Sequence, residues 1–266
     1  MNILGISAFY HDSAAALVQD GVLIAAAEEE RFSRRKHDAG FPKLAAEFCL
    51  KRGGIAAKDL DWVVFYEKPF VKFERIFQTA MATFPRGVGV FRAAMQTWLM
   101  DKLWIKAILR EELGVDPSKI AFCDHHLAHA ASSYYCSPFE KAAVLTIDGV
   151  GEWTTTSQGV AEGTRVRLTR EMRFPHSLGL LYSAFTAFLG FEVNEGEYKV
   201  MGMAPYGEPK HLDKVWKLMD LADDGSFQLR MEYFKYPYSL KNTYKQFQAR
   251  LNPPPSPPTP PEENHG

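Results

Sequence analysis

Short apolar runs separated by turn residues dominate the first thirty positions of the chain. Residues 3–7, 14–18 and 22–27 each have the length and composition of a β-strand. Asp20-Gly21, between the second and third runs, is a dipeptide typical of a hairpin turn. This pattern predicts a β-meander, and it places the polar loop Phe9-Tyr10-His11-Asp12-Ser13 at the rim of the sheet, where ligands are usually bound.

The next segment changes to a helical pattern and then returns to a strand. Residues 43–52 predict a helix closed by Gly53-Gly54, and residues 62–66 predict a fourth strand. Residues 70–113 are helical in character and are broken at Pro85-Arg86-Gly87. Their large apolar side chains are typical of packing, so we interpret 67–118 as a helical insertion in an α/β unit.

A similar order of elements recurs after residue 138. Residues 142–147 and 165–170 predict strands around a further strand, with turns at Asp148 and at Glu162-Gly163, and a helix follows at 177–189. The repeated order predicts an α/β fold with a duplicated ribonuclease-H-like core, as in actin-like and sugar-kinase ATPases. In that fold the Asp12-Ser13 and Asp148-Gly149 turns would face each other across a bound phosphate or acyl donor.

The predicted domain boundaries follow from this repeat. The first half is expected at 1–142 and the start of the second half at 143–250, with the second half incomplete. Residues 251–266 are rich in proline, a composition that cannot pack a core, and they are predicted to form a disordered tail.

Composition and charge narrow the class of protein. The chain has 266 residues, of which 46% are hydrophobic and 24% are charged, as is usual for a globular protein of one or two domains. A formal net charge of -1 and a pI near 6.7 favour neither nucleic acid nor a membrane surface as a partner. We expect a cytoplasmic protein, because the chain opens without a signal-peptide pattern and its most apolar segment, 91–109, is interrupted by charged residues.

A candidate metal site lies around residues 125–148. The alanine-rich run 127–135 predicts a helix, which puts His125 and His129 one turn apart on one face. Asp148 follows the strand 142–147, so two imidazoles and a carboxylate can converge. The alternatives are a helix-surface pair or a satisfied pair in the core, and His126 competes with His125 as a ligand.

Other residues are candidates for binding an anion. Gly149 and Gly151 allow backbone N–H groups to approach a phosphate, although such turns also simply join strands. Ser177 is a plausible N-cap of the helix that follows it, and Lys199 lies in a glycine-rich segment that is either a mobile loop or a phosphate contact. The basic run 31–37 is more typical of a solvated face than of a functional one.

Six stretches in order resemble the O-carbamoyltransferases of antibiotic and nodulation-factor biosynthesis, which include the tobramycin and cephamycin enzymes. The resemblance covers residues 3 to about 206. The stretches are Phe9-Tyr10-His11-Asp12-Ser13-Ala14-Ala15, Ala27-Glu28-Glu29-Glu30-Arg31-Phe32-Ser33-Arg34, His125-His126-Leu127-Ala128-His129-Ala130-Ala131-Ser132, Asp148-Gly149-Val150-Gly151-Glu152, Ser177-Leu178-Gly179 and Glu197-Tyr198-Lys199-Val200-Met201-Gly202.

The resemblance implies an enzyme of two parts. A carboxy-terminal domain makes carbamoyl-adenylate from ATP and carbamoyl phosphate, and the amino-terminal domain moves the carbamoyl group to a hydroxyl of a small molecule or glycan. It further implies that His125, His129 and Asp148 bind a divalent metal, with iron as the first choice, and that His11 takes the hydroxyl proton. The implied walls of the adenylate pocket are Gly151, Glu152, Gly179, Lys199 and Gly202.

The chain departs from this family near its end. Full-length relatives continue with the rest of the second half, a further acidic metal ligand and the adenylate-forming domain, so we expect a fragment whose missing domain is supplied in cis or in trans. The alternatives are a non-catalytic remnant or binding module, a sugar-kinase-like phosphotransferase, and a simple metallohydrolase. The acceptor is not readable from the sequence.

Overall fold

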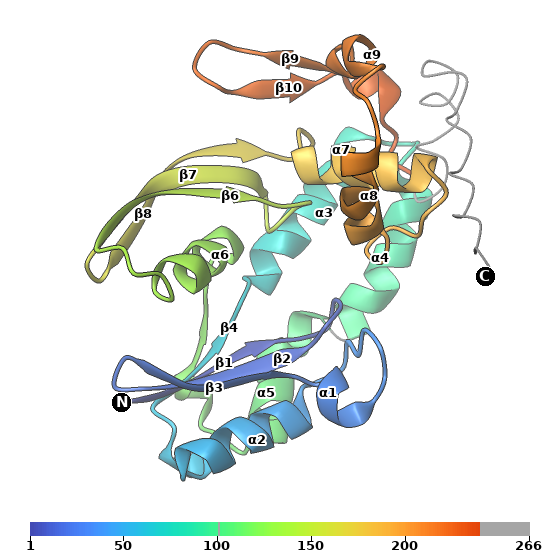
Figure 1. Ribbon diagram of the computed structural model, residues 1–266. Helices are drawn as coiled ribbons and strands as arrows, with labels where there is room; N and C mark the ends of the chain where they lie inside the picture. The colour runs from blue at the N-terminus through green and yellow to red at the C-terminus, as the bar shows by residue number, and fades with distance from the viewer. Residues whose placement is uncertain (101, 240–266) are drawn as a thin grey trace, which may run out of the picture.

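The computed structural model describes residues 1–100 and 102–239, and within them it is a mixed α/β fold (Figure 1). A five-stranded sheet with the order β3-β2-β1-β4-β5 forms its lower part in Figure 1. The predicted meander and fourth strand are confirmed in it. Its strands are β1 (Asn2–Ser7), β2 (Ala14–Gln19), β3 (Val22–Glu28), β4 (Trp62–Phe65) and β5 (Ile120–Phe122).

Strand β1 lies in the middle of this sheet. It pairs antiparallel with β2, where Ile6 faces Ala15, and parallel with β4, where Ile6 faces Phe65. Helices α2 (Lys43–Gly53) and α5 (Ile105–Leu113) cover one face of the sheet (Figure 1). The buried apolar side chains of these elements form the largest core cluster, which includes Leu4, Ile6, Leu17, Ala45, Cys49, Val63, Phe65 and Leu109.

Helices fill the chain between β4 and β5. Helix α3 (Pro69–Ala82) begins with a proline in its first turn, where a missing N–H is tolerated, and α4 (Val88–Met100) follows it. The predicted break at residues 85–87 separates them, and the rings of Phe77 and Phe91 meet across the pair at 6.0 Å. The short helices of this half are α1 (Glu30–Ser33), η1 (Ala57–Asp59), η2 (Lys102–Trp104) and η3 (Pro117–Lys119).

A second, three-stranded antiparallel sheet has the order β6-β7-β8. Its strands are β6 (Lys141–Ile147), β7 (Thr154–Glu162) and β8 (Arg165–Arg173), and helix α6 (His125–Tyr134) packs on one face (Figure 1). Ala130 and Tyr134 of α6 meet Val144 and Ala161 of the sheet in a small core. The helix and the strands predicted for 127–170 are therefore present.

The rest of the described chain packs beyond this sheet. Helix α7 (Leu178–Phe188) begins at Ser177, whose hydroxyl accepts a hydrogen bond from the N–H of Leu180 at 3.0 Å, so the predicted N-cap is confirmed. Its apolar side chains join those of a hairpin in a third core cluster. The remaining elements are α8 (Glu197–Met203), η4 (Ala204–Tyr206), α9 (Leu212–Trp216), β9 (Met219–Leu221), β10 (Phe227–Leu229) and η5 (Met231–Tyr233).

One segment differs from its expected local structure. The glycine-rich stretch around Lys199 was predicted as a loop, but residues 197–203 form helix α8. Gly196 takes the N-cap position and Glu197 lies in the first turn, where a carboxylate is favoured by the helix dipole. The good helix formers Lys199, Met201 and Met203 then outweigh Gly202.

The predicted tail, 251–266, lies outside the described residues, as do 240–250 at the end of the predicted second half. Among the helices of the described part, none has the length and apolar character needed to cross a membrane.

Candidate active site

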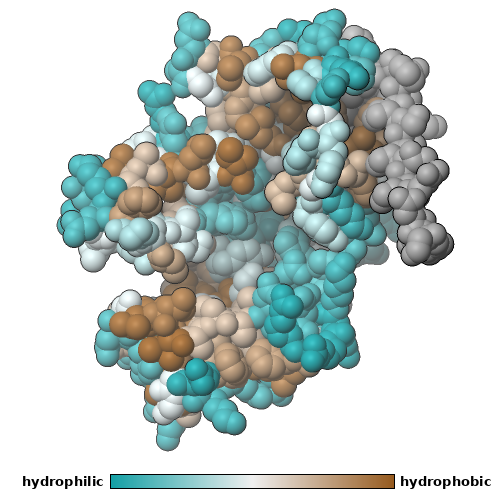
Figure 2. Space-filling model, viewed as in Figure 1, coloured by the Kyte–Doolittle hydropathy of each residue, from teal (hydrophilic) through white to brown (hydrophobic). Residues whose placement is uncertain are grey.

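A cleft of about 780 Å³ opens between the two sheets. Figure 2 shows this face of the molecule hollowed between the lower part, which carries β1 to β3, and the upper part. The residues that line the cleft come from the ends of β1, β4 and β6 and from helices α3, α6, α7 and α8. They include His11, Asp12, Tyr66, Lys72, His125, His129, Asp148, Gly149, Gly179 and Glu197.

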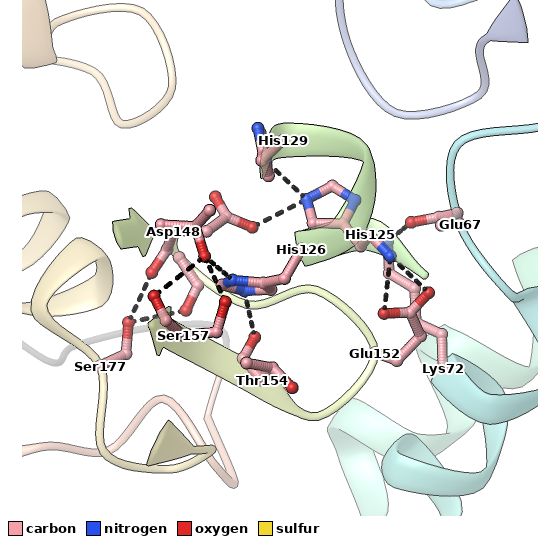
Figure 3. A network of polar contacts seen from close by, with 12 residues as sticks. Glu67, Lys72, His125, His126, His129, Asp148, Glu152, Thr154, Ser157 and Ser177 are labelled. Carbon is pink, nitrogen blue, oxygen red and sulfur yellow. Dashed lines mark hydrogen bonds and ion pairs between the residues drawn. The ribbon is translucent and has the colours of Figure 1, made fainter. Parts of the chain in front are cut away.

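Three potential metal ligands, His125, His129 and Asp148, line this cleft, and their side chains lie close to one another in Figure 3. The Nε2 atom of His125 lies 3.0 Å from Nε2 of His129 and 2.9 Å from Oδ2 of Asp148. One ligand atom from each of the three residues lies within 4.8 Å of the others. Atoms that bind a cation at ~2.1 Å in neighbouring octahedral positions are ~3.0 Å apart, so the spacing fits a metal ion.

The protonation states of Asp148 and His129 also favour metal binding. Burial alone would raise the pKa of Asp148, but the hydrogen bond and charge of His125, with the Gly149 N–H, lower it to about 2. Burial and the neighbouring His125 lower the pKa of His129. The site therefore presents an ionised carboxylate and a neutral imidazole, which are the forms that bind metals.

Hydrogen bonds alone satisfy this cluster poorly. The Nε2 atom of His125 carries either one proton or one lone pair, yet it lies within hydrogen-bond distance of both His129 and Asp148. Its other ring nitrogen, Nδ1, is buried and has no hydrogen-bond partner in the described part of the chain. A cation would accept the Nε2 lone pairs of both histidines and the carboxylate together.

His126 is used differently from its two neighbours. It is 3% exposed, its Nε2–H donates to the carbonyl of Thr154 at 2.8 Å, and its Nδ1 accepts from the hydroxyl of Thr146 at 2.6 Å. The Thr146 hydroxyl also meets that of Ser157 at 2.6 Å. Both ring nitrogens of His126 are thus occupied inside the second sheet (Figure 3), away from the pair formed by His125 and His129.

The turn after β6 is held by unusually close packing. A Cβ atom on Gly179 would lie 2.5 Å from the carbonyl of Asp148, and one on Gly151 would lie 3.0 Å from the ring of His125. Real Cβ atoms do not approach a backbone as closely as 2.5 Å, so position 179 needs glycine, whereas a side chain at position 151 would require the His125 ring to shift. Gly179 and Gly149 also line the cleft.

Glu152 is placed as a structural carboxylate. It is buried and accepts hydrogen bonds from the backbone N–H groups of Lys68 at 2.8 Å and His125 at 3.1 Å. It therefore caps the amino terminus of α6 and fixes that helix to the start of α3. It does not line the cleft with Asp148 and Gly149.

The remaining predicted site residues divide between the cleft and other surroundings. His11 and Asp12 line the cleft from the loop after β1. Ser13 is buried beneath them, and its hydroxyl has no hydrogen-bond partner among the described residues. Lys199 and Gly202 lie exposed on α8 outside the cleft lining, with the Lys199 ammonium 5.8 Å from the centre of the Tyr198 ring.

Lys72 and Tyr66 are among the cleft residues that the analysis of the sequence did not single out. Lys72 of α3 forms an ion pair of 2.6 Å with the buried Glu67, and Tyr66 packs its ring 5.4 Å from that of His125. Burial raises the pKa of the Tyr66 hydroxyl. For Tyr66 the available signal was its position, because residues that directly follow a parallel strand such as β4 meet at the ligand-binding edge of a sheet.

Comparison with known proteins assigns the chain to a family. The model of the carbamoyltransferase N-terminus matches residues 2–254. The chain therefore belongs to this carbamoyltransferase family, as the six motifs predicted.

Two relatives show how much of a longer protein the match covers. The Synechocystis protein sll1178 is 54% identical over 254 residues, which are 92% of this chain and 41% of that protein. The nodulation protein NolNO of Sinorhizobium fredii is 38% identical over 227 residues, which are 84% of this chain and 32% of that protein. The chain thus spans less than half the length of these relatives.

A solved structure was also compared. YeaZ from Pseudomonas aeruginosa is 14% identical and aligns with 65% of this chain and 67% of its own, with a TM-score of 0.32. A likeness of this size carries no argument about the fold or the site.

Proposed function

We propose that this chain transfers a carbamoyl group from carbamoyl-adenylate to a hydroxyl of a small molecule or glycan, with the help of a divalent metal. The observation that carries the proposal is the single cleft lined by His11, on one side, and by His125, His129 and Asp148, on the other. Membership of the carbamoyltransferase family and the similarity to a nodulation protein support carbamoyl as the group that is moved.

In this proposal His11 is the general base. Its imidazole takes the proton of the acceptor hydroxyl while the hydroxyl oxygen forms a bond to the carbamoyl carbon. The bond between that carbon and the phosphate oxygen breaks, and AMP leaves with the electron pair. A histidine suits this role because its ordinary pKa lies near neutrality.

The chain's own residues would hold the metal and the donor. His125, His129 and Asp148 would bind a divalent cation, with iron as the first choice, and the bound cation would polarise the carbamoyl carbonyl or hold the phosphate. Asp12, Ser13, Gly149, Gly151, Glu152, Gly179, Lys199 and Gly202 are the proposed surroundings of the adenylate. Of these, the cleft lining includes Asp12, Gly149 and Gly179, which makes them the best supported.

We further propose that the donor is made elsewhere. An adenylate-forming domain, in the same polypeptide or in another, would produce carbamoyl-adenylate from ATP and carbamoyl phosphate. The length of the relatives supports such a supplier, because each extends far beyond the matched region. Neither nucleic acid nor membrane is a proposed partner, and the proposed location is the cytoplasm.

The fold proposal is a duplicated ribonuclease-H-like core, with its halves at 1–142 and 143–250, an insertion at 67–118 and an incomplete second half. Two meanders support it, since β1-β2-β3 and β6-β7-β8 share strand order and each is followed by a helix. In each of them the loop after the first strand lines the same cleft.

Metal content tests the site directly. Elemental analysis of the purified chain should find about one divalent ion per chain, and His125→Ala or His129→Ala should lose it. His126→Ala should retain most of the metal, because the ring of His126 is occupied by Thr146 and Thr154. If His126→Ala alone removes the metal, the proposed ligand set is wrong.

Transfer is tested by supplying carbamoyl-adenylate to the metal-loaded chain, alone and with the adenylate-forming polypeptide of a relative. We expect AMP release that depends on an added hydroxyl acceptor. His11→Ala should keep the metal and abolish transfer. Full transfer by His11→Ala would remove His11 as the base, whereas phosphoryl transfer to a sugar would favour a kinase.

A further inference from the structure

The basic run at residues 31–37 was interpreted from the sequence as a solvated face. Its last residue, His37, contacts Asp12, which in turn contacts the proposed base His11. The Nδ1 atom of His37 lies 2.8 Å from Oδ1 of Asp12, and the other oxygen of the same carboxylate lies 2.8 Å from Nδ1 of His11. One carboxylate therefore joins two imidazoles that are 26 positions apart in the chain.

The loop that carries His37 is fastened to the loop that carries His11. The N–H of Ser13 donates to the carbonyl of Asp38 at 2.8 Å, and the N–H of Phe9 donates to the carbonyl of Ala39 at 2.8 Å. The N–H of His37 donates to the Glu30 carboxylate at 3.0 Å. These bonds fix the separation of the two loops independently of the imidazoles.

Backbone conformation adds to this picture. Phe9, Asp12 and His37 have φ values of 69°, 47° and 54°. Residues other than glycine seldom adopt this left-handed backbone conformation. Such conformations are strained, and residues that adopt them concentrate where function requires a particular geometry. Here all three lie within or beside the carboxylate-bridged pair.

The chemistry of the bridge decides which ring nitrogens carry protons. Burial acts to raise the pKa of Asp12, but hydrogen bonds from His37 and His11 outweigh it, so the pKa is lowered and the carboxylate is ionised. An ionised carboxylate only accepts hydrogen bonds, so each imidazole must carry its proton on Nδ1. A neutral imidazole protonated on Nδ1 has its lone pair on Nε2.

We propose that Asp12 and His37 are positioning residues, which hold His11 as the Nδ1–H tautomer and keep its Nε2 lone pair available to the cleft. This inference rests on the proposed role of His11 as the base. His11 is 47% exposed and lines the cleft, whereas Nε2 of His37 is buried, so only His11 can meet an acceptor. A carboxylate that orients a metal-bound histidine commonly contributes about 10- to 100-fold in affinity or activity, and we expect an effect of that order at His11.

Asp12 and His37 could instead bind a metal ion together with Glu30, and the experiments below distinguish this alternative. Ligand atoms of Asp12, Glu30 and His37 lie within 4.8 Å of one another, as a metal site would require. Nε2 of His125 lies between two partners, whereas Nδ1 of His37 meets only Oδ1 of Asp12 among the described residues, so a hydrogen bond satisfies this pair without a cation. We therefore expect no second metal here, and a second equivalent that Asp12→Asn removes would overturn the proposal.

The tautomer of His11 can be measured without any transfer reaction. In the full chain with ¹⁵N-labelled histidine, two-bond ¹⁵N–¹H correlations distinguish the protonated ring nitrogen from the unprotonated one, and His11→Gln assigns the signal. We expect Nδ1–H for His11 in the wild type and a loss of that preference in Asp12→Asn. An Nε2–H tautomer in the wild type, or no change in Asp12→Asn, would overturn the proposal even if the chain transfers carbamoyl groups.

Enzyme kinetics then shows whether Asp12 and His37 orient His11 or only stabilise the loop. Asp12→Asn should lower kcat by about 10- to 100-fold with little change in the KM of the hydroxyl acceptor, and His37→Gln should lower kcat less, because its effect passes through Asp12. Asp38→Asn is the matched control, since its carboxylate accepts from the N–H of Gly40 and does not contact His11. An equal loss of kcat in Asp38→Asn would assign the loop only a structural role.

If no transfer is found for the wild type, the proposed function fails while the tautomer measurement still stands. The two results are therefore distinguishable.

Discussion

The two antiparallel meanders use the same strand order and hold their site residues by different means. In β1 the inward residues Leu4 and Ile6 are aliphatic and 0% and 2% exposed, and the strand is hydrogen-bonded on both edges. In β6 the matching inward residues are Val144 and Thr146, and the strand is the edge of its sheet in the described part of the chain. Leu145, on the outward face of β6, is 64% exposed.

This difference concerns how each strand end is positioned. The loop after β1 starts from a core of close-packed aliphatic side chains. The hydrophobic stabilisation of such a core is non-directional and scales with the buried apolar area. The turn after β6 leaves a smaller core in which the hydroxyl of Thr146 bridges His126 and Ser157. Directional bonds of that kind define the orientation of α6, but they tolerate few substitutions.

The largest expected effect tests the aliphatic core. Ile6→Ala should lower the free energy of unfolding by about 3 kcal/mol, because it removes buried methylene groups and leaves a cavity beside Phe65. Urea denaturation measures the change. A loss below about 1 kcal/mol would mean that the first meander is not the better packed of the two.

The polar core should be the next most sensitive. Thr146→Val keeps the shape of the side chain but leaves Nδ1 of His126 and the hydroxyl of Ser157 without a partner, at a cost of about 2 kcal/mol. The same denaturation experiment applies, with Ile6→Val, expected to cost about 1 kcal/mol, as the control in the first meander. If Thr146→Val costs no more than Ile6→Val, the hydrogen-bonded network is not what positions α6.

Lowering the pH should destabilise the fold around His176, which lies between β8 and α7. Burial lowers the pKa of this imidazole, and its Nδ1 accepts a hydrogen bond from the N–H of Leu229 at 3.1 Å. The unfolded state therefore binds a proton more readily than the folded one, so stability is lost as pH falls through about 6.5. We expect Tm to fall by about 2 °C more between pH 7 and 5 in the wild type than in His176→Gln. Equal slopes would contradict this assignment.

The smallest effect is expected on the outward face of β6. Leu145→Ala should change the free energy of unfolding by less than about 0.5 kcal/mol, because the side chain is mostly exposed. A cost of 2 kcal/mol or more in the purified chain would show that this face is covered in solution, and the contrast between the meanders would then disappear.

Much of the local structure followed from the sequence. Short apolar runs and turn residues predicted both meanders, an alanine-rich run predicted the helix containing His125 and His129, and Pro85-Arg86-Gly87 predicted the break between α3 and α4. Ser177 was correctly predicted as an N-cap. The family was also readable, because six short motifs in order are specific even where each one alone is weak. These features depend on residues that are close in the chain, so their physical causes are local.

Only the tertiary structure decided which of the marked residues meet. His126 and His125 are neighbours in sequence, but the packing of α6 sends one into the second sheet and the other to Asp148. Glu152 belongs to the same motif as Gly149, yet it caps α6 instead of lining the cleft. His37, 25 positions from Asp12, is joined to it by the folding of one loop on another. Residue type and spacing determined the candidates, whereas burial and long-range hydrogen bonds selected among them, because these depend on contacts that no local pattern encodes.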